Sequence, residues 1–220
     1  MGLIGKARKI LGMSITKFIW YNFMAGNVSR GKGCWLIPMR GTRIDLAKSA
    51  KIRLNGTITF GINKRRGSKA ECLVLLRDNA NLTVSGPVNL YYGTTLEVHK
   101  GGDLTIGSLN ANTGSVIICA KKMTIGQRVR MARNVFVFDS DHHPIYSVEG
   151  KLINDARDVV IEDDCWLGLK STVLKGTTIH AGTVIGANSL VSGEIPGGVI
   201  VSTIPARPVM KVEYHGPECR

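Results

Sequence analysis

Two histidines and two acidic residues lie within five positions of the sequence, in a stretch that ends at a proline. The stretch contains Asp139, Asp141, His142 and His143, followed by Pro144. An imidazole titrates near neutral pH, so it can take a proton from a weak nucleophile such as an alcohol. A nearby carboxylate can fix the tautomer of the ring and stabilise its protonated form. The stretch is therefore a candidate acid–base site; the alternative is a solvated polar loop whose histidines have no role.

The element that must position this stretch is a repeat of six residues. Aliphatic residues recur at every sixth position: Ile161, Leu167, Val173, Ile179, Ile185 and Val191. Four positions after each of the first five stands a small or β-branched residue: Cys165, Ser171, Thr177, Thr183 and Ser189. A period of six fits neither a helix nor a single strand. With turn residues such as Gly176 and Gly182, it predicts short strands that meet at the corners of a β-helix and point their aliphatic side chains inward.

A second phrase, two apolar residues separated by one residue, recurs earlier in the chain. Its copies are Ile52/Leu54, Leu82/Val84, Leu104/Ile106, Met123/Ile125 and Val159/Ile161. If one coil takes three repeats of six residues, some successive copies of the phrase are farther apart than one coil. The extra residues fall in the basic segment 63–69 and, in larger number, before Ile161. We predict that residues 138–158 form a loop inserted into the coil. Long loops on regular scaffolds often carry function, and this one begins with the acid–base candidates.

Composition limits the class of protein. The 220 residues can form one sizeable core, and the 26 glycines suit a fold with many corners. The five cysteines show no CxxC spacing, so we expect reduced thiols in a cytoplasmic protein. No apolar run approaches the length of a membrane span, and no signal peptide is evident. The formal charge of +13 implies an acidic partner: a phosphorylated ligand, a membrane surface or a nucleic acid. The basic residues are scattered without aromatic interleaving, which argues against nucleic acid.

The chain divides into three parts. Residues 1–27 are predicted to form an amphipathic basic helix, with Lys6, Arg8, Lys9 and Lys17 among its apolar residues. This helix either caps the end of the coil or lies on an anionic membrane through residues 1–24, and the two are compatible. Residues 28–211 form the β-helix domain, and residues 212–220 form a polar tail.

The sequence resembles the hexapeptide-repeat acyltransferases. The phrases that carry the resemblance are Ile125-Gly126 with Val129, Arg133-Asn134-Val135, the segment 139–145, Cys165-Trp166-Leu167-Gly168, the segment 184–191 and Pro205-Ala206-Arg207. The resemblance implies an all-β fold, a left-handed parallel β-helix with an N-terminal amphipathic helix and one long looped-out active-site segment. The likeness is closest to the sugar O-acetyltransferases of capsule, O-antigen and exopolysaccharide assembly.

By this resemblance the chain transfers an acetyl group directly from acetyl-CoA to a sugar hydroxyl, with a histidine as general base and no metal. The family's catalytic histidine commonly precedes a proline, which favours His143, whereas a gap-free alignment from Ile125 gives His142. Asp141 or Asp139 would hold the ring, and Asn134 and Asp139 would contact the acceptor. The alternatives are an N-acetyltransferase acting on an amino sugar and a non-catalytic β-helix module that binds a glycan or a membrane surface.

The resemblance also implies a homotrimer in which CoA lies along the outside of the last coils, between subunits. The residues at matching positions are Trp166, Gly168, Leu169, Lys170, Gly186, Ala187, Ser192, Ala206, Arg207 and Lys211. Lys175 could add positive charge near the phosphates, and Trp166 could instead pack in a subunit interface. Relatives often carry Thr-Lys or Thr-Arg where this chain has Ser192-Gly193-Glu194, so one phosphate contact is expected to differ. We therefore expect the protein to lie in the cytoplasm, where it could also bind peripherally to the inner face of the membrane.

Overall fold

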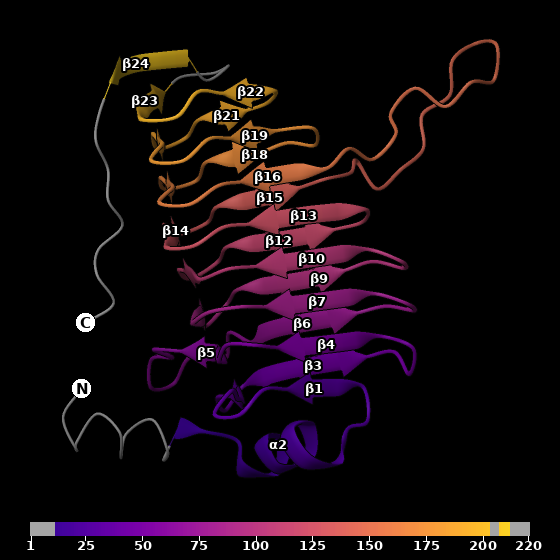
Figure 1. The fold of residues 1–220 in the computed structure, drawn as a ribbon, viewed down its shortest axis with the longest axis vertical. Coiled ribbons are helices and arrows are strands. Elements are labelled where there is room, and N and C mark those ends of the chain that lie inside the picture. Colours follow the sequence, from indigo (N-terminus) through magenta and orange to yellow (C-terminus); the bar gives the residue numbers. More distant parts are fainter. Residues whose placement is uncertain (1–11, 203–206, 212–220) are drawn as a thin grey trace.

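The computed structural model describes residues 12–202 and 207–211, which form a parallel β-helix with a short helical segment at its N-terminal end (Figure 1). Each coil contributes one strand to each of three sheets. The strands are short because a turn follows every inward-pointing aliphatic residue of the repeat.

The strands of each sheet stack in a regular spatial order. The first sheet contains β1 (Val28–Arg30), β4 (Lys51–Leu54), β7 (Asn81–Val84), β10 (Asp103–Ile106), β13 (Lys122–Ile125), β16 (Val159–Ile161), β19 (Thr178–Ile179) and β22 (Glu194–Ile195). The second contains β2 (Leu36–Pro38), β5 (Ile58–Ile62), β8 (Val88–Tyr91), β11 (Leu109–Ala111), β14 (Val129–Met131), β17 (Trp166–Leu167), β20 (Val184–Ile185), β23 (Val199–Ser202) and β24 (Arg207–Lys211). The third contains β21 (Leu190–Val191), β18 (Thr172–Val173), β15 (Phe136–Phe138), β12 (Val116–Cys119), β9 (Thr95–Val98), β6 (Cys72–Leu76) and β3 (Thr42–Leu46).

The core confirms the period of six. The six aliphatic residues from Ile161 to Val191 are each 0% exposed, and the small residues between them are buried beside them. Gly176 and Gly182 adopt positive φ at the corners, a conformation that glycine takes without steric cost. The copies of the earlier phrase stack in register on the first sheet, with Leu82 opposite both Ile52 and Leu104, and Met123 opposite Val159. The fold class predicted from the sequence is therefore confirmed.

The helical segment covers the N-terminal end of the coil. It consists of α2 (Ile15–Ile19) and the π-helical turn η1 (Trp20–Met24). The Asn22 amide accepts from the backbone N–H of Leu36 and donates to its carbonyl, and the Tyr21 hydroxyl donates to the carbonyl of Ile44. Met13 forms an antiparallel bridge with Met39, so no continuous helix reaches Trp20 from the start of the chain. Residues 1–11, with Lys6, Arg8 and Lys9, lie outside the described residues, as do 203–206 and 212–220.

Two further elements depart from the coil. The segment 139–158, which we call the arm, leaves the coil between β15 and β16 and projects far from it (Figure 1). Strand β24 pairs with β23 in antiparallel fashion at the C-terminal end. Within residues 12–202 and 207–211, no helix has the length and apolar character needed to cross a membrane.

Candidate active site

The corner between the third and first sheets, which we call the arm corner, is closed by Asp139. Its side chain is 0% exposed, and its carboxylate accepts hydrogen bonds from the backbone N–H groups of Ala120 (2.6 Å), Lys121 (2.8 Å) and Lys122 (2.9 Å). Through these three hydrogen bonds the Asp139 carboxylate fixes the turn that follows β12. Asp139 was expected to hold a histidine ring or contact the acceptor, but the structure places its carboxylate on the backbone instead.

Asp141 fixes the base of the arm. Its carboxylate accepts hydrogen bonds from Lys175 Nζ (2.5 Å) and from the side-chain amide of Asn154 (3.0 Å). The Lys175 hydrogen bond, followed by that of Asn154, lowers the pKa of Asp141 below its ordinary value. Lys175 Nζ also donates to the carbonyl of Asn154 at 2.9 Å. Lys175 was expected to add charge near the cofactor, and Asp141 to hold the ring of a histidine; in the structure they bind each other.

His143 combines a fixed backbone with an open side chain. Its N–H donates to the carbonyl of Asp141 (2.8 Å), and its own carbonyl accepts from the side-chain amide of Asn154 (2.8 Å). The residue is exposed, and among the described residues no hydrogen bond or ion pair engages its ring. The imidazole is thus presented from an anchored position to whatever lies beside the arm corner.

His142 turns back against the coil. It has a φ of 63°, and its ring lies 5.0 Å from that of His99 and 6.0 Å from that of Phe138, centroid to centroid. Burial, followed by the neighbouring His99, lowers the pKa of His142 from its ordinary value. His99 Nε2 lies 3.3 Å from Glu97 Oε1, so a carboxylate stands behind the two rings. The described residues contain no group of three potential ligands that could hold a metal ion.

His99 and Glu97 were not recognised as site residues from the sequence. A signal for them does exist in the repeat. His99 directly follows β9, and Asp139 directly follows β15, which are strands of the same sheet. Residues that follow strands of one sheet stack at one corner of the coil, so the register alone brings His99 close to the arm.

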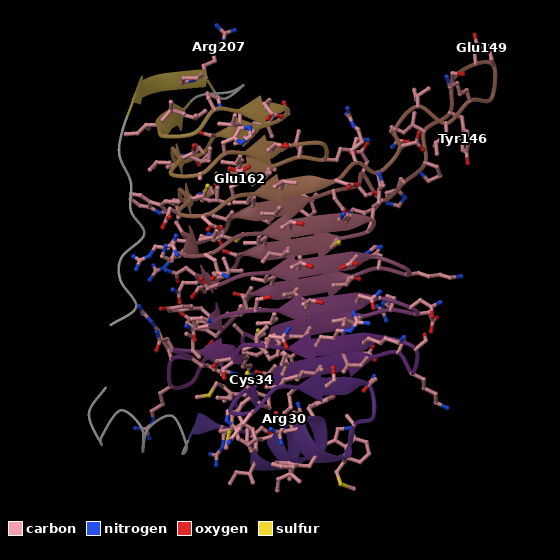
Figure 2. All side chains as sticks on the ribbon, in the orientation of Figure 1. Arg30, Cys34, Tyr146, Glu149, Glu162 and Arg207 are labelled. Atoms are coloured by element: carbon pink, nitrogen blue, oxygen red, sulfur yellow. The ribbon has the colours of Figure 1, made fainter. Side chains whose placement is uncertain are left out.

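The residues expected to bind CoA gather on the second sheet and at its corner with the third sheet. Trp166 on β17 is 44% exposed and Leu169 is 42% exposed. Lys170 and Ala187 are exposed beside them, one coil apart. Arg207 begins β24, on the same sheet near the end of the coil (Figure 2). These side chains form an open surface with an apolar part and positive charge.

Other residues of that expected set have different surroundings. A Cβ on Gly168 would lie 2.6 Å from the carbonyl oxygen of Ile185, so coil stacking alone requires this glycine, whereas one on Gly186 would lie 2.9 Å from Ser202 Oγ, a hydroxyl that can rotate away. Ser192 follows β21 and therefore lies on the arm corner, away from the others. Asn134, expected to contact the acceptor, has a φ of 56° at the corner between the second and third sheets. Ala206 and the side chain of Lys211 lie outside the described residues.

Comparisons with known proteins place the chain among acetyltransferases. No protein-family model matches it. It is 25% identical over 165 residues to galactoside O-acetyltransferase of Escherichia coli (strain K12), covering 75% of this chain and 77% of that protein. It is 36% identical over 87 residues to polysialic acid O-acetyltransferase of Neisseria meningitidis, covering 38% of this chain and 40% of that protein. Among solved structures, the polysialic-acid-specific acetyltransferase NeuO is 20% identical, covers 88% of this chain and 91% of its own, and superposes with a TM-score of 0.38.

The chain is a parallel β-helix of hexapeptide repeats, interrupted by one arm that contains the pair His143-Pro144. The relatives named above are acetyltransferases. The chain is thus similar to acetyltransferases over most of its length, and it is an acyltransferase.

Proposed function

We propose that the protein transfers an acetyl group from acetyl-CoA to a hydroxyl group of a carbohydrate, in the assembly of a surface polysaccharide. The relatives named for galactoside and polysialic acid O-acetylation support a sugar acceptor. The observation that carries the proposal is His143, whose backbone is anchored on both sides while its ring is free to meet an acceptor.

His143 acts as the general base in this proposal. Its ring takes the proton of the acceptor hydroxyl as the oxygen forms the new ester bond, and then gives the proton to the departing sulfur, so no net proton is gained or lost. His142 is packed against Phe138 and His99, and burial, followed by the neighbouring His99, lowers its pKa. We assign His142 a positioning role: its left-handed backbone turns the chain so that His143 faces outward.

The exposed surface on the second sheet fits acetyl-CoA. Trp166 and Leu169 offer apolar contact for an extended arm, and Lys170 and Arg207 offer positive charge for phosphates. When bound there, acetyl-CoA would supply the acetyl group as an activated thioester. The chain's own part is to hold the donor and to move the proton.

A trimer would complete this site. His143 stands at the arm corner, whereas Trp166 and Leu169 stand on another face of the coil. One chain therefore presents the base and the donor surface in different directions, and cyclic association would bring the base of one copy to the donor surface of the next. We place the enzyme in the cytoplasm, which agrees with the four described cysteines, none of which forms a disulfide.

The experiment follows thiol release from acetyl-CoA with galactosides and polysialic acid as the first acceptors. His143→Ala is expected to lower kcat by about 10²–10⁴-fold, the usual contribution of a general base. His142→Ala, the matched control, should lose less, and Arg207→Ala should mainly raise the KM for acetyl-CoA. Near-native turnover of the His143 variant with loss in the His142 variant would move the base by one residue. Full activity in both would exclude the mechanism.

A further inference from the structure

The net charge of the protein resides in its N-terminal third. Residues 1–69 hold 15 of the 29 Lys and Arg residues but only one of the 16 acidic residues, Asp45. Their formal charge is +14, whereas residues 70–220, with 14 basic and 15 acidic residues, carry −1. Of the described residues, 12–69 hold 12 basic residues and one acidic residue, and because coils stack in sequence order, the helix-bearing end of the coil is strongly basic (Figure 1).

The same end exposes apolar side chains. Ile15, Ile19, Trp20, Phe23 and Met24 of α2 and η1 are each between 50 and 65% exposed. Their spacing of four residues, from 15 to 19 to 23 and from 20 to 24, places them on one side of the helical segment. The opposite side is held to the coil by Tyr21 and Asn22. The apolar side is therefore at least half exposed, with Trp20 and Met24 nearest the first coils.

A groove connects the apolar face with positive charge. It has a volume of about 640 Å³ and lies between the helical segment and the first coils, lined by Trp20, Met24, Lys48, Lys51 and Arg53, among others. The three cations are exposed, and no carboxylate in residues 12–202 forms an ion pair with them. Two acids reach the lining: Asp78 accepts a hydrogen bond from Ser49 at 3.1 Å, and Asp45 lies close enough to Tyr21 to help raise the pKa of its hydroxyl, after burial. The groove therefore holds a surplus of positive charge beside an aromatic ring.

Arg30 adds a fourth observation on the same end (Figure 2). Its guanidinium lies 4.9 Å from the ring centre of Phe23 and 4.3 Å from that of Trp35. Cations stacked on partly exposed aromatic rings suit a boundary between water and an apolar phase, where the rings enter the apolar phase and the charge stays at the phosphates.

We infer that the helix-bearing end of the coil binds an anionic phospholipid surface. Five apolar side chains enter the boundary between headgroups and acyl chains, while Lys48, Lys51 and Arg53 contact lipid phosphates. Basic charge alone would suit any polyanion, including nucleic acid. The exposed apolar face decides for lipid, because a nucleic-acid backbone offers nothing to cover Ile15, Ile19 and Met24.

This orientation sets the height of the active site above the membrane. In the third sheet, four strand spacings separate β3 from β15, which precedes the arm. At ~4.8 Å per spacing the arm corner stands about 19 Å above the first coil. The inference is independent of the acyl-transfer proposal, since vesicle binding needs neither His143 nor acetyl-CoA.

The test is co-sedimentation of the full chain with vesicles of phosphatidylcholine alone or with about 30% phosphatidylserine. We expect binding to the anionic vesicles only, weakening as salt rises from about 0.1 to 0.5 M. Lys48→Glu/Lys51→Glu/Arg53→Glu should reduce the bound fraction at least tenfold, and Ile15→Ser/Ile19→Ser should reduce it severalfold. The matched controls are Lys100→Glu/Lys151→Glu for charge and Ile145→Ser/Val148→Ser for exposed apolar area, and both should bind like the native chain.

Three results would overturn the inference. The first is no sedimentation with anionic vesicles, including the case in which the chain binds duplex DNA of equal phosphate content instead. The second is a charge-reversed variant that is folded by circular dichroism and binds normally. The third is loss of binding on neutralising Lys6, Arg8 and Lys9 while the groove variant keeps it, since that would place the contact on the first residues of the chain.

Discussion

Asp139 illustrates how a residue can look catalytic and be structural. It stands two positions from Asp141 and three from His142, so its type and place suit an acid–base site. In the fold it is buried, and three backbone N–H groups occupy its carboxylate. Without it the turn would lose three charge-assisted hydrogen bonds to its backbone. Asp139 therefore shapes the corner from which the histidines project.

His180 is the residue whose charge should couple stability to pH. Its Nδ1 lies 3.1 Å from Glu162 Oε1, and its Nε2 contacts Glu194. Hydrogen bonds to Glu194 and then to Glu162 raise the pKa of His180 in the folded chain. A raised folded pKa gives stability that is fully present below the unfolded value of about 6.5 and is lost as pH rises through the folded value.

His180→Gln should therefore lower the urea midpoint of unfolding most near pH 6, and the difference from the native chain should shrink towards pH 9. His99→Gln is the control for the loss of a partly exposed imidazole elsewhere. A difference for His180→Gln that stays constant from pH 6 to pH 9 would show that its two carboxylate contacts add no pH-dependent stability.

At the scale of elements, the repeat was predictable and the arm was predictable only in part. A period of six records which side chains face the axis, so Leu167, Val173 and Ile179 were identified as core from sequence, and the start of the arm followed from the surplus before Ile161. The contact between His99 and His142 could not be predicted from the sequence. It depends on how the arm folds back, which no periodic pattern encodes. The same holds for Lys175, whose partner Asp141 lies 34 residues away.

The arm depends on a small clamp at its base. Lys175 binds Asp141 and the carbonyl of Asn154, and Asn154 in turn binds the backbone of His143. Beyond this clamp the arm has few contacts with the coil, and Tyr146 and Glu149 near its tip extend into solvent (Figure 2). The same clamp therefore fixes the position of His143 and keeps the arm ordered.

Lys175→Met keeps much of the stem length but removes the charge. We expect faster limited proteolysis within residues 145–153 and a severalfold drop in kcat, with little change in the temperature of unfolding, because the buried coil is untouched. Lys170→Met, on a neighbouring corner, is the control and should leave cleavage of the arm unchanged. Unaltered cleavage in the Lys175 variant would show that the clamp does not order the arm.

At the scale of the whole molecule, the proposed trimer follows from the separation of the base and the donor surface. Light scattering of the full chain should give three times the chain mass of 23.8 kDa. Trp166→Asp should shift the mass downwards if this 44%-exposed ring lies in the interface, and Trp20→Ser, at the helix-bearing end, should not. A native chain with the mass of a monomer at working concentration would contradict both the trimer and the shared site.

The strand β24 affects whether copies of the chain can stack end to end into a filament. A parallel β-helix ends in open strand edges, onto which the first coil of another copy could stack and extend the coil as a filament. Here β24 runs antiparallel to β23 and offers an edge of the wrong polarity, while α2 and η1 cover the opposite end. Elements that do not obey the repeat thus oppose end-to-end stacking at the helix-bearing end and, at the other end, along the second sheet.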